Sequence, residues 1–375
     1  MENFQNPRNF EEKNYKEVRI GEIMATNSLS FLPPSSQINA ALWERLYKLK
    51  LNVSKLDDAT IPCALRYHPI NNSTTAPYLF DRDSISYPGE NTDSENSIGI
   101  KLRGTLKNYN SVQEFKDSDK KKIILDLTCD IIKHVVSKAA IDDPSLLYPF
   151  ILLSYADLKS YRFTYWFCLP CILPSSPFTY LVPPVSLKDI SEHKLILNEI
   201  YSKYQHLSCL LFYIRKNSSD NLWCAHTLKD SWEYVFSDNG FLVIIDNGVG
   251  NSFTWLLRNL LILLSYYAPS TTPVNIRVVA LRNPTLYMKV DINELIANDC
   301  SLVIQLPVAA QYYPFSLGEQ LTLPDSAIIY VKGYESNERG KFVPLFLMST
   351  THQPNFCPSR RKAGSSFSRF AVNFR

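Results

Sequence analysis

Residues 149–174, PFILLSYADLKSYRFTYWFCLPCILP, hold the densest cluster of aromatic residues in the chain. The first half, residues 150–156, is short and continuously apolar, whereas every second side chain over residues 161–168 is aromatic. A period of two is typical of a β-strand, and only residues 157–160 separate the two halves. The stretch therefore predicts a β-hairpin, in a sheet that is covered on both faces.

Length and composition indicate a folded protein with two packed units. The chain of 375 residues exceeds the roughly 250–300 residues at which one hydrophobic core usually stops growing. Hydrophobic residues make up 45% and charged residues 20%, which is ordinary for a globular protein. The net charge is +3, and residues 350–375 carry five basic residues and no acidic one, so the rest of the chain is close to neutral. This balance predicts no nucleic-acid partner.

The chain shows no signal for export or for membrane insertion. Its first residues, MENFQNPRNFEEKNYKE, lack the apolar region of a secretory signal. The most apolar helical segment, residues 256–268, is interrupted by Arg258 and Asn259 and is shorter than the roughly 20 residues that span a bilayer. Eight scattered cysteines are typical of core residues in a reducing compartment. We therefore expect a cytoplasmic location.

Two amphipathic helices are predicted before the hairpin. Ser35 or Ser36 is expected to cap the first, and the charge of Asp119 suits the N-terminus of the second. Between them, residues 71–96 are rich in Asn, Ser, Thr, Asp and Pro, which predicts a long surface loop or a partly disordered insertion. The apolar stripes are Leu42, Trp43, Leu46 and Leu49 in the first helix, and Ile124, Leu127, Ile131 and Val135 in the second.

A second unit follows a proline-rich crossing at residues 174–186. Its order of strand, helix and strand over residues 241–281 is the signature of a right-handed parallel crossover. The predicted elements are a helix at 187–204, strands at 210–215, 222–228 and 241–246, a helix at 255–268, and strands at 274–281, 302–306, 327–331 and 342–347.

The predicted fold class is α/β, with two sheet-based subdomains, mixed sheets and flanking helices, and without an adenylating Rossmann-type domain. The predicted divisions are a flexible N-terminal arm at residues 1–28, a first subdomain at 29–173, a second subdomain at 174–349, and a divergent basic tail at 350–375.

Two short motifs have the spacing of chemical sites. Cys168 and Cys171 form a CxxC, but they end an apolar strand and enclose a proline. Redox cysteines lie where a helix N-terminus lowers the thiolate pKa, so core packing is the favoured interpretation here. Gly248 and Gly250 form a GxG between a predicted strand and a predicted helix, but Phe253 stands where a nucleotide-binding fingerprint needs its third glycine. A tight turn is favoured there.

The other polar residues predict neither a catalytic nor a metal site. The six histidines show no metal-ligand spacing with one another or with cysteine pairs, and no GxSxG occurs. Arg258 and Asn259, inside an apolar helix, suit a structural role as well as they suit a contact with a partner. The residues alone therefore indicate a cytosolic α/β protein that acts as a binding module.

Several motifs carry a resemblance to a known family. PSLLYPFILLSYADLKSYRFTYWFCLP (144–170) is similar, nearly residue for residue, to a hallmark of the N-terminal domain of the autophagy E1-like enzymes, the family of autophagy-related protein seven. FLPPSSQINAALWERLYKLKLNVSKLDD (31–58), FKDSDKKK (115–122), TWLLRNLLIL (254–263) and GYESNERGKFVP (333–344) resemble further family motifs in the same order. The segment after Met348 departs from the family pattern.

The resemblance implies a domain that recruits E2-like conjugating enzymes of both autophagy pathways, so that a modifier passes from the E1 cysteine to the bound E2. In the family, ATP, zinc and the thioester-forming cysteine belong to an adenylating domain that these 375 residues do not contain. No catalytic, cofactor-binding or metal-binding residue is therefore expected in this chain. Ubiquitin-like modifiers are expected to be only indirect partners, and a flexible E2 segment is expected to pair with a sheet edge or to fill an apolar groove.

Two alternatives remain open on the sequence. The chain could be a regulatory or competitor form that sequesters E2 enzymes. It could also be an unrelated small-molecule or thiol redox enzyme that uses Gly248 or the pair Cys168 and Cys171. Because the family's dimer is built by the adenylating part, a monomer is expected, in the cytoplasm and at the preautophagosomal structure.

Overall fold

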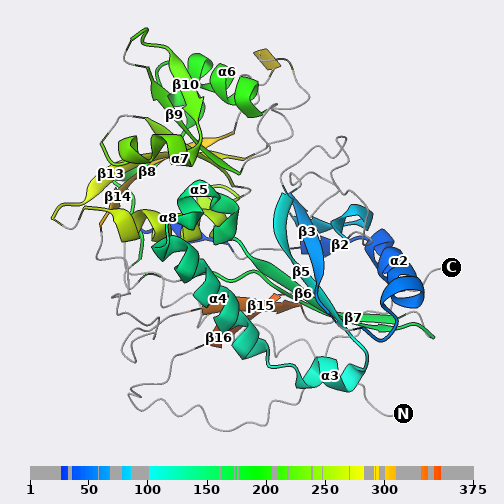
Figure 1. Ribbon diagram of the computed structural model, residues 1–375. Coiled ribbons are helices and arrows are strands. Elements are labelled where there is room, and N and C mark those ends of the chain that lie inside the picture. Colours follow the sequence, from blue (N-terminus) through cyan, green and yellow to red (C-terminus); the bar gives the residue numbers. More distant parts are fainter. Residues whose placement is uncertain are drawn as a thin grey trace, which may run out of the picture.

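The computed structural model describes residues 27–32, 36–57, 59–67, 78–85, 101–159, 162–172, 174, 177–204, 210–217, 219–237, 240–246, 248–269, 271–282, 291, 293–294, 300–309, 331–336 and 342–347. Two six-stranded sheets dominate this part of the chain (Figure 1). The predicted α/β class with mixed sheets is confirmed.

The first sheet has the order β2-β4-β3-β5-β6-β7. Its strands are β2 (Ser36–Ile38), β3 (Ile61–Tyr67), β4 (Tyr78–Phe80), β5 (Lys101–Tyr109), β6 (Phe150–Asp157) and β7 (Arg162–Cys168). Its helices are α2 (Ala40–Leu49), α3 (Val112–Asp117), α4 (Lys120–Val136) and α5 (Ala139–Asp142), with a π-helical turn, η1 (Lys50–Ser54), after α2, and the 3-10 turns η2 (Arg82–Ser84) and η3 (Pro144–Leu147).

The second sheet has the order β10-β9-β11-β13-β14-β8. Its strands are β8 (Val182–Ser186), β9 (Leu211–Lys216), β10 (Trp223–His226), β11 (Phe241–Ile245), β13 (Val274–Leu281) and β14 (Leu302–Val308). Its helices are α6 (His193–Tyr204), α7 (Leu228–Ser231) and α8 (Trp255–Tyr267), with 3-10 turns η4 (Leu187–Asp189) and η5 (Trp232–Tyr234). The described residues also form two short strand pairs: β1 (Ser30–Phe31) with β12 (Ser252–Phe253), and β15 (Val331–Ser336) with β16 (Phe342–Leu347).

The hairpin predicted at residues 150–168 is confirmed as β6 and β7. The strands pair antiparallel, with Asp157 opposite Arg162 at the turn. Both faces of β7 are covered, because Trp166 on one face and Phe163 on the other are each 1% exposed or less. On the Phe163 side, the Trp43 ring of α2 stacks on Phe163 with ring centroids 4.8 Å apart. Aromatic packing therefore holds α2 to this sheet.

Two predictions at the start of the chain are wrong in detail. The N-cap of α2 is Asn39, whose side chain accepts the Ala41 N–H at 2.9 Å, whereas Ser36 lies in β2. Residues 71–96 are also not wholly loop, because they contain β4 and η2. The reason is Phe80, which is fully buried and lies edge-on to Phe150 with ring centroids 5.7 Å apart. Burial of one aromatic side chain outweighs the polar composition around it.

The helix predicted after Asp119 is confirmed as α4. The Asp119 carboxylate accepts the Lys122 N–H at 3.0 Å, and Ile124, Ile131 and Val135 are fully buried. The short helix α3 before it was not predicted. Its signal was present in the sequence, because Ser111 and Glu114 form a capping box.

The parallel crossover predicted in the second unit is confirmed. β11 and β13 pair in parallel, and α8 connects them. The helix predicted at 187–204 begins only at His193, because residues 187–189 form a 3-10 turn that Ser186 caps. Its buried residues are Ile196, Leu197 and Ile200.

The last two predicted strands, which were assigned to the second unit, do not join its sheet. β15 and β16 pair with each other in a separate sheet, and β15 lies against β7 of the first sheet. Residues 327–330, where one strand was expected to begin, lie outside the described residues.

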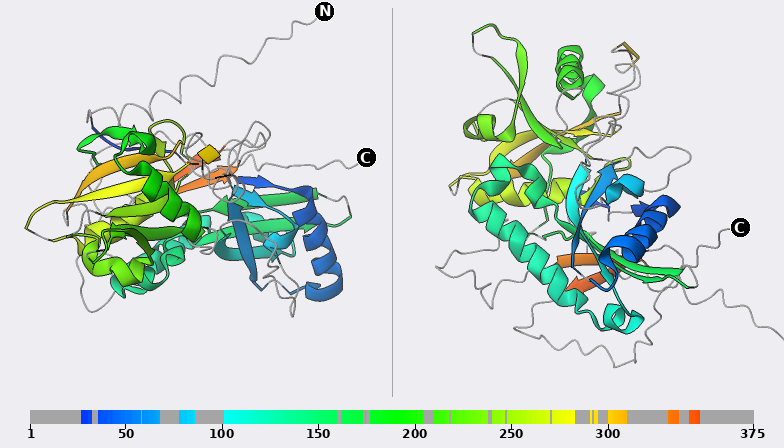
Figure 2. Two further views of the ribbon diagram at one scale, coloured as in Figure 1. Left: turned by 90° about the horizontal axis from the view of Figure 1, so that it is seen from above. Right: turned by 45° about the vertical axis from the view of Figure 1, so that its right-hand side comes forward.

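Helix α8 joins the two sheets. The Tyr148 hydroxyl donates to the Leu256 carbonyl at 3.0 Å, and the Tyr267 hydroxyl donates to the Val135 carbonyl of α4 at 2.8 Å. The buried apolar residues of both sheets form one continuous cluster. Figure 2 shows the sheets side by side, with α2 on the outer side of the first sheet. The division of the chain at residue 173 stays a prediction.

Candidate protein-docking surface

The CxxC motif lies inside the core. Cys168 and Cys171 are fully buried, and both are free thiols. Burial in apolar surroundings raises the pKa of the Cys168 thiol, which is the opposite of what a reactive thiolate needs. The prediction that these cysteines pack in the core is confirmed, and the redox interpretation loses its geometric support.

The space beside the GxG motif at Gly248 and Gly250 is filled by two charged side chains, Asp246 and Arg282. Asp246, fully buried at the end of β11, accepts the Gly248 N–H at 2.8 Å and both the N–H and the hydroxyl of Thr254 at 2.8 Å. The Arg282 guanidinium donates to the same carboxylate at 2.9 Å. Thr254 directly precedes α8, so the carboxylate occupies the position where a helix N-terminus would bind a phosphate.

Only glycine fits at position 248 in this arrangement. A side chain there would collide with the Ser252 carbonyl and with the Arg282 guanidinium. The Asp246 carboxylate, bound to Gly248 and Arg282, occupies the place that a nucleotide phosphate would need, so the nucleotide-binding interpretation of Gly248 and Gly250 loses its geometric support.

Arg258 and Asn259, both in α8, have structural roles. Asn259 is 1% exposed, accepts the Ile172 N–H at 3.1 Å, and donates to the Leu147 and Pro170 carbonyls at 2.9 and 3.1 Å. Its amide therefore ties α8 to the segments on either side of the hairpin. The Arg258 guanidinium lies over the Phe31 ring, 4.7 Å from its centroid. Both residues hold segments of this chain together.

Two sheet edges are protected against strand addition. In β8, Pro183 and Pro184 lack N–H groups. Beside β10, Glu199 of α6 accepts the Ala225 N–H at 2.9 Å, and Glu192 accepts the Trp223 indole N–H at 3.1 Å. Such devices prevent edge-to-edge pairing. Docking of a partner segment by strand addition is therefore not favoured at these edges.

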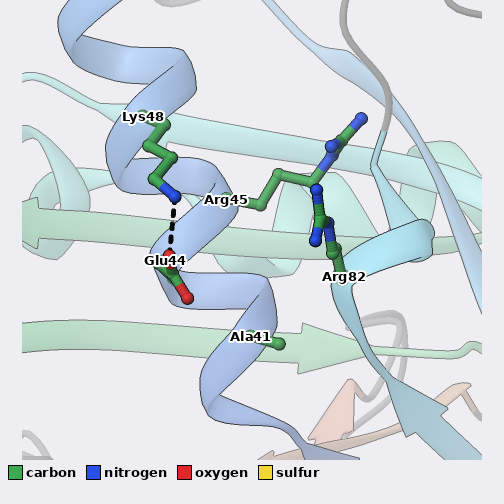
Figure 3. A pocket seen from close by; sticks show the side chains of 5 residues that line it. All are labelled: Ala41, Glu44, Arg45, Lys48 and Arg82. Carbon is green, nitrogen blue, oxygen red and sulfur yellow. Dashed lines mark hydrogen bonds and ion pairs between the residues drawn. The ribbon is translucent and has the colours of Figure 1, made fainter.

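A hollow of about 80 Å³ lies between α2 and η2, on the outer side of the first sheet. Its lining residues are Ala41, Glu44, Arg45, Lys48 and Arg82. Figure 3 shows the Arg45 and Arg82 guanidinium groups next to each other, and beside them the ion pair between Glu44 and Lys48, which are one turn of α2 apart. The Lys48 ammonium is 2.6 Å from the Glu44 carboxylate, while the Arg45 Nε–H donates to the Ile85 carbonyl at 2.7 Å. Cations therefore outnumber carboxylates in this lining by three to one.

The charges in the hollow affect one another. The hydrogen bond from Lys48 and the Lys48 charge lower the pKa of Glu44, and the Arg82 charge contributes in the same direction. Glu44 therefore stays ionised at a lower pH than an ordinary glutamate does. This site was not predicted from the sequence. Its signal was the charged face of α2 at positions 44, 45 and 48, but Arg82 comes from a segment predicted as a loop.

An exposed apolar turn follows α2. Leu51, Val53 and Leu56 are 47%, 46% and 82% exposed. The buried Lys50 donates to the Asn110 side chain at 2.6 Å, and the Asn110 amide donates to the Leu56 carbonyl at 2.7 Å. The apolar side chains are thus presented on a turn that is hydrogen-bonded to the first sheet.

Within the described residues, no group of three or more histidine, cysteine, aspartate or glutamate side chains is arranged to hold a metal ion. His68, His206 and His352 lie outside those residues. No helix among the described segments is long and apolar enough to span a membrane.

Residues 29–348 match the family model described as the N-terminus of the ubiquitin-like modifier-activating enzyme ATG7. The atg7 enzyme of Dictyostelium discoideum is 28% identical over 349 residues, which cover 88% of this chain and 47% of that enzyme. The human ATG7 is 26% identical over 339 residues, which cover 85% of this chain and 43% of that enzyme. The chain thus spans about half the length of these relatives.

Solved structures support the fold. The Kluyveromyces marxianus Atg7NTD aligns with a TM-score of 0.54 at 18% identity and covers 78% of this chain and 96% of that chain. The Atg7NTD in complex with Atg10 from the same yeast gives the same TM-score and identity over 86% of this chain and 97% of that chain.

Proposed function

This chain belongs to the family of ATG7 N-terminal regions, and on that premise we propose that it recruits E2-like conjugating enzymes for an autophagy E1-like enzyme. The observation that carries the proposal is the extent of the family match, from residue 29 to residue 348. The complex of the related yeast domain with Atg10 supports the choice of partner class.

The geometry supports a binding role rather than chemistry in the described part of the chain. Cys168 and Cys171 are buried, and Asp246 with Arg282 fills the turn that could have held a phosphate. The two motifs that first suggested an enzyme, Cys168 with Cys171 and Gly248 with Gly250, therefore have structural roles. Outward-facing charges and apolar groups, such as those along α2 and η1, are what a docking surface uses.

The proposed mechanism is positional. An E2-like enzyme bound to this chain is held near the E1 thioester, so that its own cysteine reacts at a raised effective concentration. The gain depends on the geometry of attachment and needs no reacting residue in this chain. The proposed place of action is the cytoplasm, including the preautophagosomal structure.

Titration calorimetry tests the proposal. The purified chain is titrated with the Atg10 counterpart and with the E2-like enzyme of the other autophagy pathway from the same organism. We expect a one-to-one complex with at least one of them, tighter than about 10 μM, an affinity equivalent to roughly −7 kcal/mol. Absence of binding to both at tens of micromolar would refute the proposal.

A conjugation assay separates recruitment from competition. The chain is added in excess to a full-length E1-like enzyme of the family, its modifier and its E2. If the chain holds the E2 as proposed, excess chain withdraws E2 from the E1 and slows conjugation, and extra E2 restores the rate. An unchanged rate would contradict a shared docking surface.

A further inference from the structure

We propose that residues 27–32 are an exchangeable strap. They fill a slot for an extended peptide, and the same residues of a second copy of this chain can take their place. The slot lies between residues 178–180 on one side and β12 on the other. This inference goes beyond the E2-recruiting role and does not depend on it.

The backbone of the strap is paired on both edges. On one edge, the Leu29 N–H donates to the Phe178 carbonyl at 2.8 Å, and the Asn27 carbonyl accepts the Tyr180 N–H at 2.9 Å. On the other edge, β1 pairs with β12, and the Leu32 N–H donates to a β12 carbonyl at 2.7 Å. A segment held on two sides by main-chain hydrogen bonds occupies the position of an added β-strand.

Two side chains of the strap make the slot selective. Leu29 is 7% exposed, and Phe31 packs against the core from a partly buried position. The Arg258 guanidinium lies 4.7 Å from the centroid of the Phe31 ring, and its buried Nε has no hydrogen-bond partner among the described residues. A cation over a ring favours an aromatic side chain at that place. The fitting peptide therefore has a large aliphatic residue two positions before an aromatic one, as a second copy of this chain has.

The strap is attached by fewer buried groups than the two large sheets are. Leu29 is its one buried residue, because Asn27 and Ser30 are exposed and the other three residues are partly exposed. β1 is two residues long. Segments with few buried apolar contacts open locally at a lower free energy than the core does. An opened strap leaves the slot unpaired, and the strap of another copy restores the same contacts.

The competition between the two straps depends on protein concentration. The chain holds its own strap beside the slot at an effective concentration in the millimolar range, to an order of magnitude. Exchange is therefore a minor state at micromolar protein and increases with concentration. Reciprocal exchange produces a dimer that is held by the same strap contacts as the monomer.

Disulfide trapping between two different variants tests the proposal. The Ser30 and Ser252 hydroxyl oxygens are 3.1 Å apart, so cysteines at these positions are within reach of a disulfide when a strap fills a slot. Full-length Ser30→Cys and Ser252→Cys chains are mixed under a mild oxidant. Neither variant can form this link within itself, so the link reports exchange between copies. After digestion, mass spectrometry measures the 30–252 link. At about 200 μM protein we expect roughly one chain in ten to be linked, and more at higher concentration.

A matched pair controls for random contact between exposed cysteines. Ser30→Cys is mixed with Ser237→Cys, which places the second cysteine on another exposed serine. This pair should give less than about a tenth of the linkage of the first pair. An excess of a synthetic peptide of residues 25–34 should compete for the slot and lower the 30–252 linkage by about half or more.

The placement of one further substitution gives opposite expected signs. Phe31→Ala in the Ser30→Cys chain weakens the incoming strap, because it removes the ring that Arg258 covers, and should lower the linkage about fivefold or more. The same change in the Ser252→Cys chain weakens the strap that already fills the slot, and should raise the linkage several-fold. If Phe31→Ala prevents folding, as judged by circular dichroism, Phe31→Leu makes a smaller change with the same expected directions.

Two results would overturn the inference. One is a 30–252 linkage no greater than that of the control pair, which would show that the strap stays in its own slot. The other is a change in the same direction from both placements of the Phe31 substitution, which would show that the linkage follows general unfolding. Neither result affects the proposed binding of E2-like enzymes, which calorimetry measures separately.

Discussion

Arg282 and Arg82 lie in two sites that differ in burial: Arg282 is buried and Arg82 is exposed. Arg282 points inward and donates to the buried Asp246 carboxylate at 2.9 Å. Arg82 is exposed beside Arg45, in a hollow whose one lining carboxylate, Glu44, is paired with Lys48. The Arg282 site follows a recognisable sequence motif and is filled by the protein's own side chains. The Arg82 site has no such motif and lies at the surface. A motif that resembles a binding loop is therefore no guide to function until its electrostatic partners are known.

Removal of the buried carboxylate should have the largest effect. Asp246→Ala leaves the Arg282 guanidinium buried without its partner and deprives Thr254 of its acceptor, so the free energy of unfolding should fall by about 3–5 kcal/mol. Urea denaturation followed by circular dichroism measures the change. Asp126→Ala, on the exposed face of α4, is the control and should stay within about 0.5 kcal/mol. A loss below 1 kcal/mol in Asp246→Ala would show that the closed turn does not depend on this pair.

A methyl group at Gly248 should have the next largest effect. Gly248→Ala places a Cβ against the Ser252 carbonyl and the Arg282 guanidinium, so the free energy of unfolding should fall by about 1–3 kcal/mol. The matched change is Gly250→Asn. Gly250 has a φ of +57° and open space around it, and asparagine tolerates that conformation better than other non-glycine residues. Equal losses in the two variants would contradict the close approach at Gly248.

Charge changes in the open hollow should barely alter stability. Arg82→Gln removes a charge that is exposed at the surface, and the Lys48 and Glu44 pair is more than half exposed. Exposed ion pairs contribute about 0–1 kcal/mol. We therefore expect the double variant Lys48→Gln with Arg82→Gln to change the midpoint of thermal unfolding by no more than about 3 °C. A larger fall would mean that the hollow serves the fold rather than a partner.

The smallest expected effect is a change in the pKa of Glu44, which depends on the charges of Lys48 and Arg82. The Lys48 hydrogen bond lowers this pKa, so the folded state is favoured above the usual carboxyl pKa and loses that contribution as the pH falls through the folded value. Lys48→Ala should raise the pKa toward its usual range, and Arg82→Ala should raise it less, as measured by NMR titration of the side-chain carboxyl carbon. No response to Arg82→Ala would place that guanidinium outside the hollow.

The sequence predicted the apolar framework better than the polar surface. The hairpin, α4 and the β11–α8–β13 crossover were predictable because each has a clear hydrophobic period and short connections. The ends of α2 and α6 were misplaced, because several serines and turns could cap them equally well. β4 was missed because its position depends on one buried residue, Phe80. A single apolar residue gives no periodic pattern from which a strand could be predicted.

The hollow between α2 and η2 could not be predicted from the sequence for a similar reason. Three of its charged residues lie on one helical face and could be grouped by spacing, but Arg82 reaches them only because β4 pairs with β2 and β3. The closed turn shows the reverse case. Asp246 and Arg282 are 36 residues apart, and their contact depends on the parallel pairing of β11 with β13.

The parallel pairing of β1 with β12 has a consequence for how this protein is made. Ser30 and Ser252 are 222 positions apart, yet their hydroxyl groups are 3.1 Å apart and their strands hydrogen-bond. At about 5–20 residues per second of translation, β1 waits roughly 10–45 s after its own synthesis before its partner strand exists. During that time Phe31 lacks the strand that later pairs with it, so the first strand of the chain stays without its partner until residue 253 has been made.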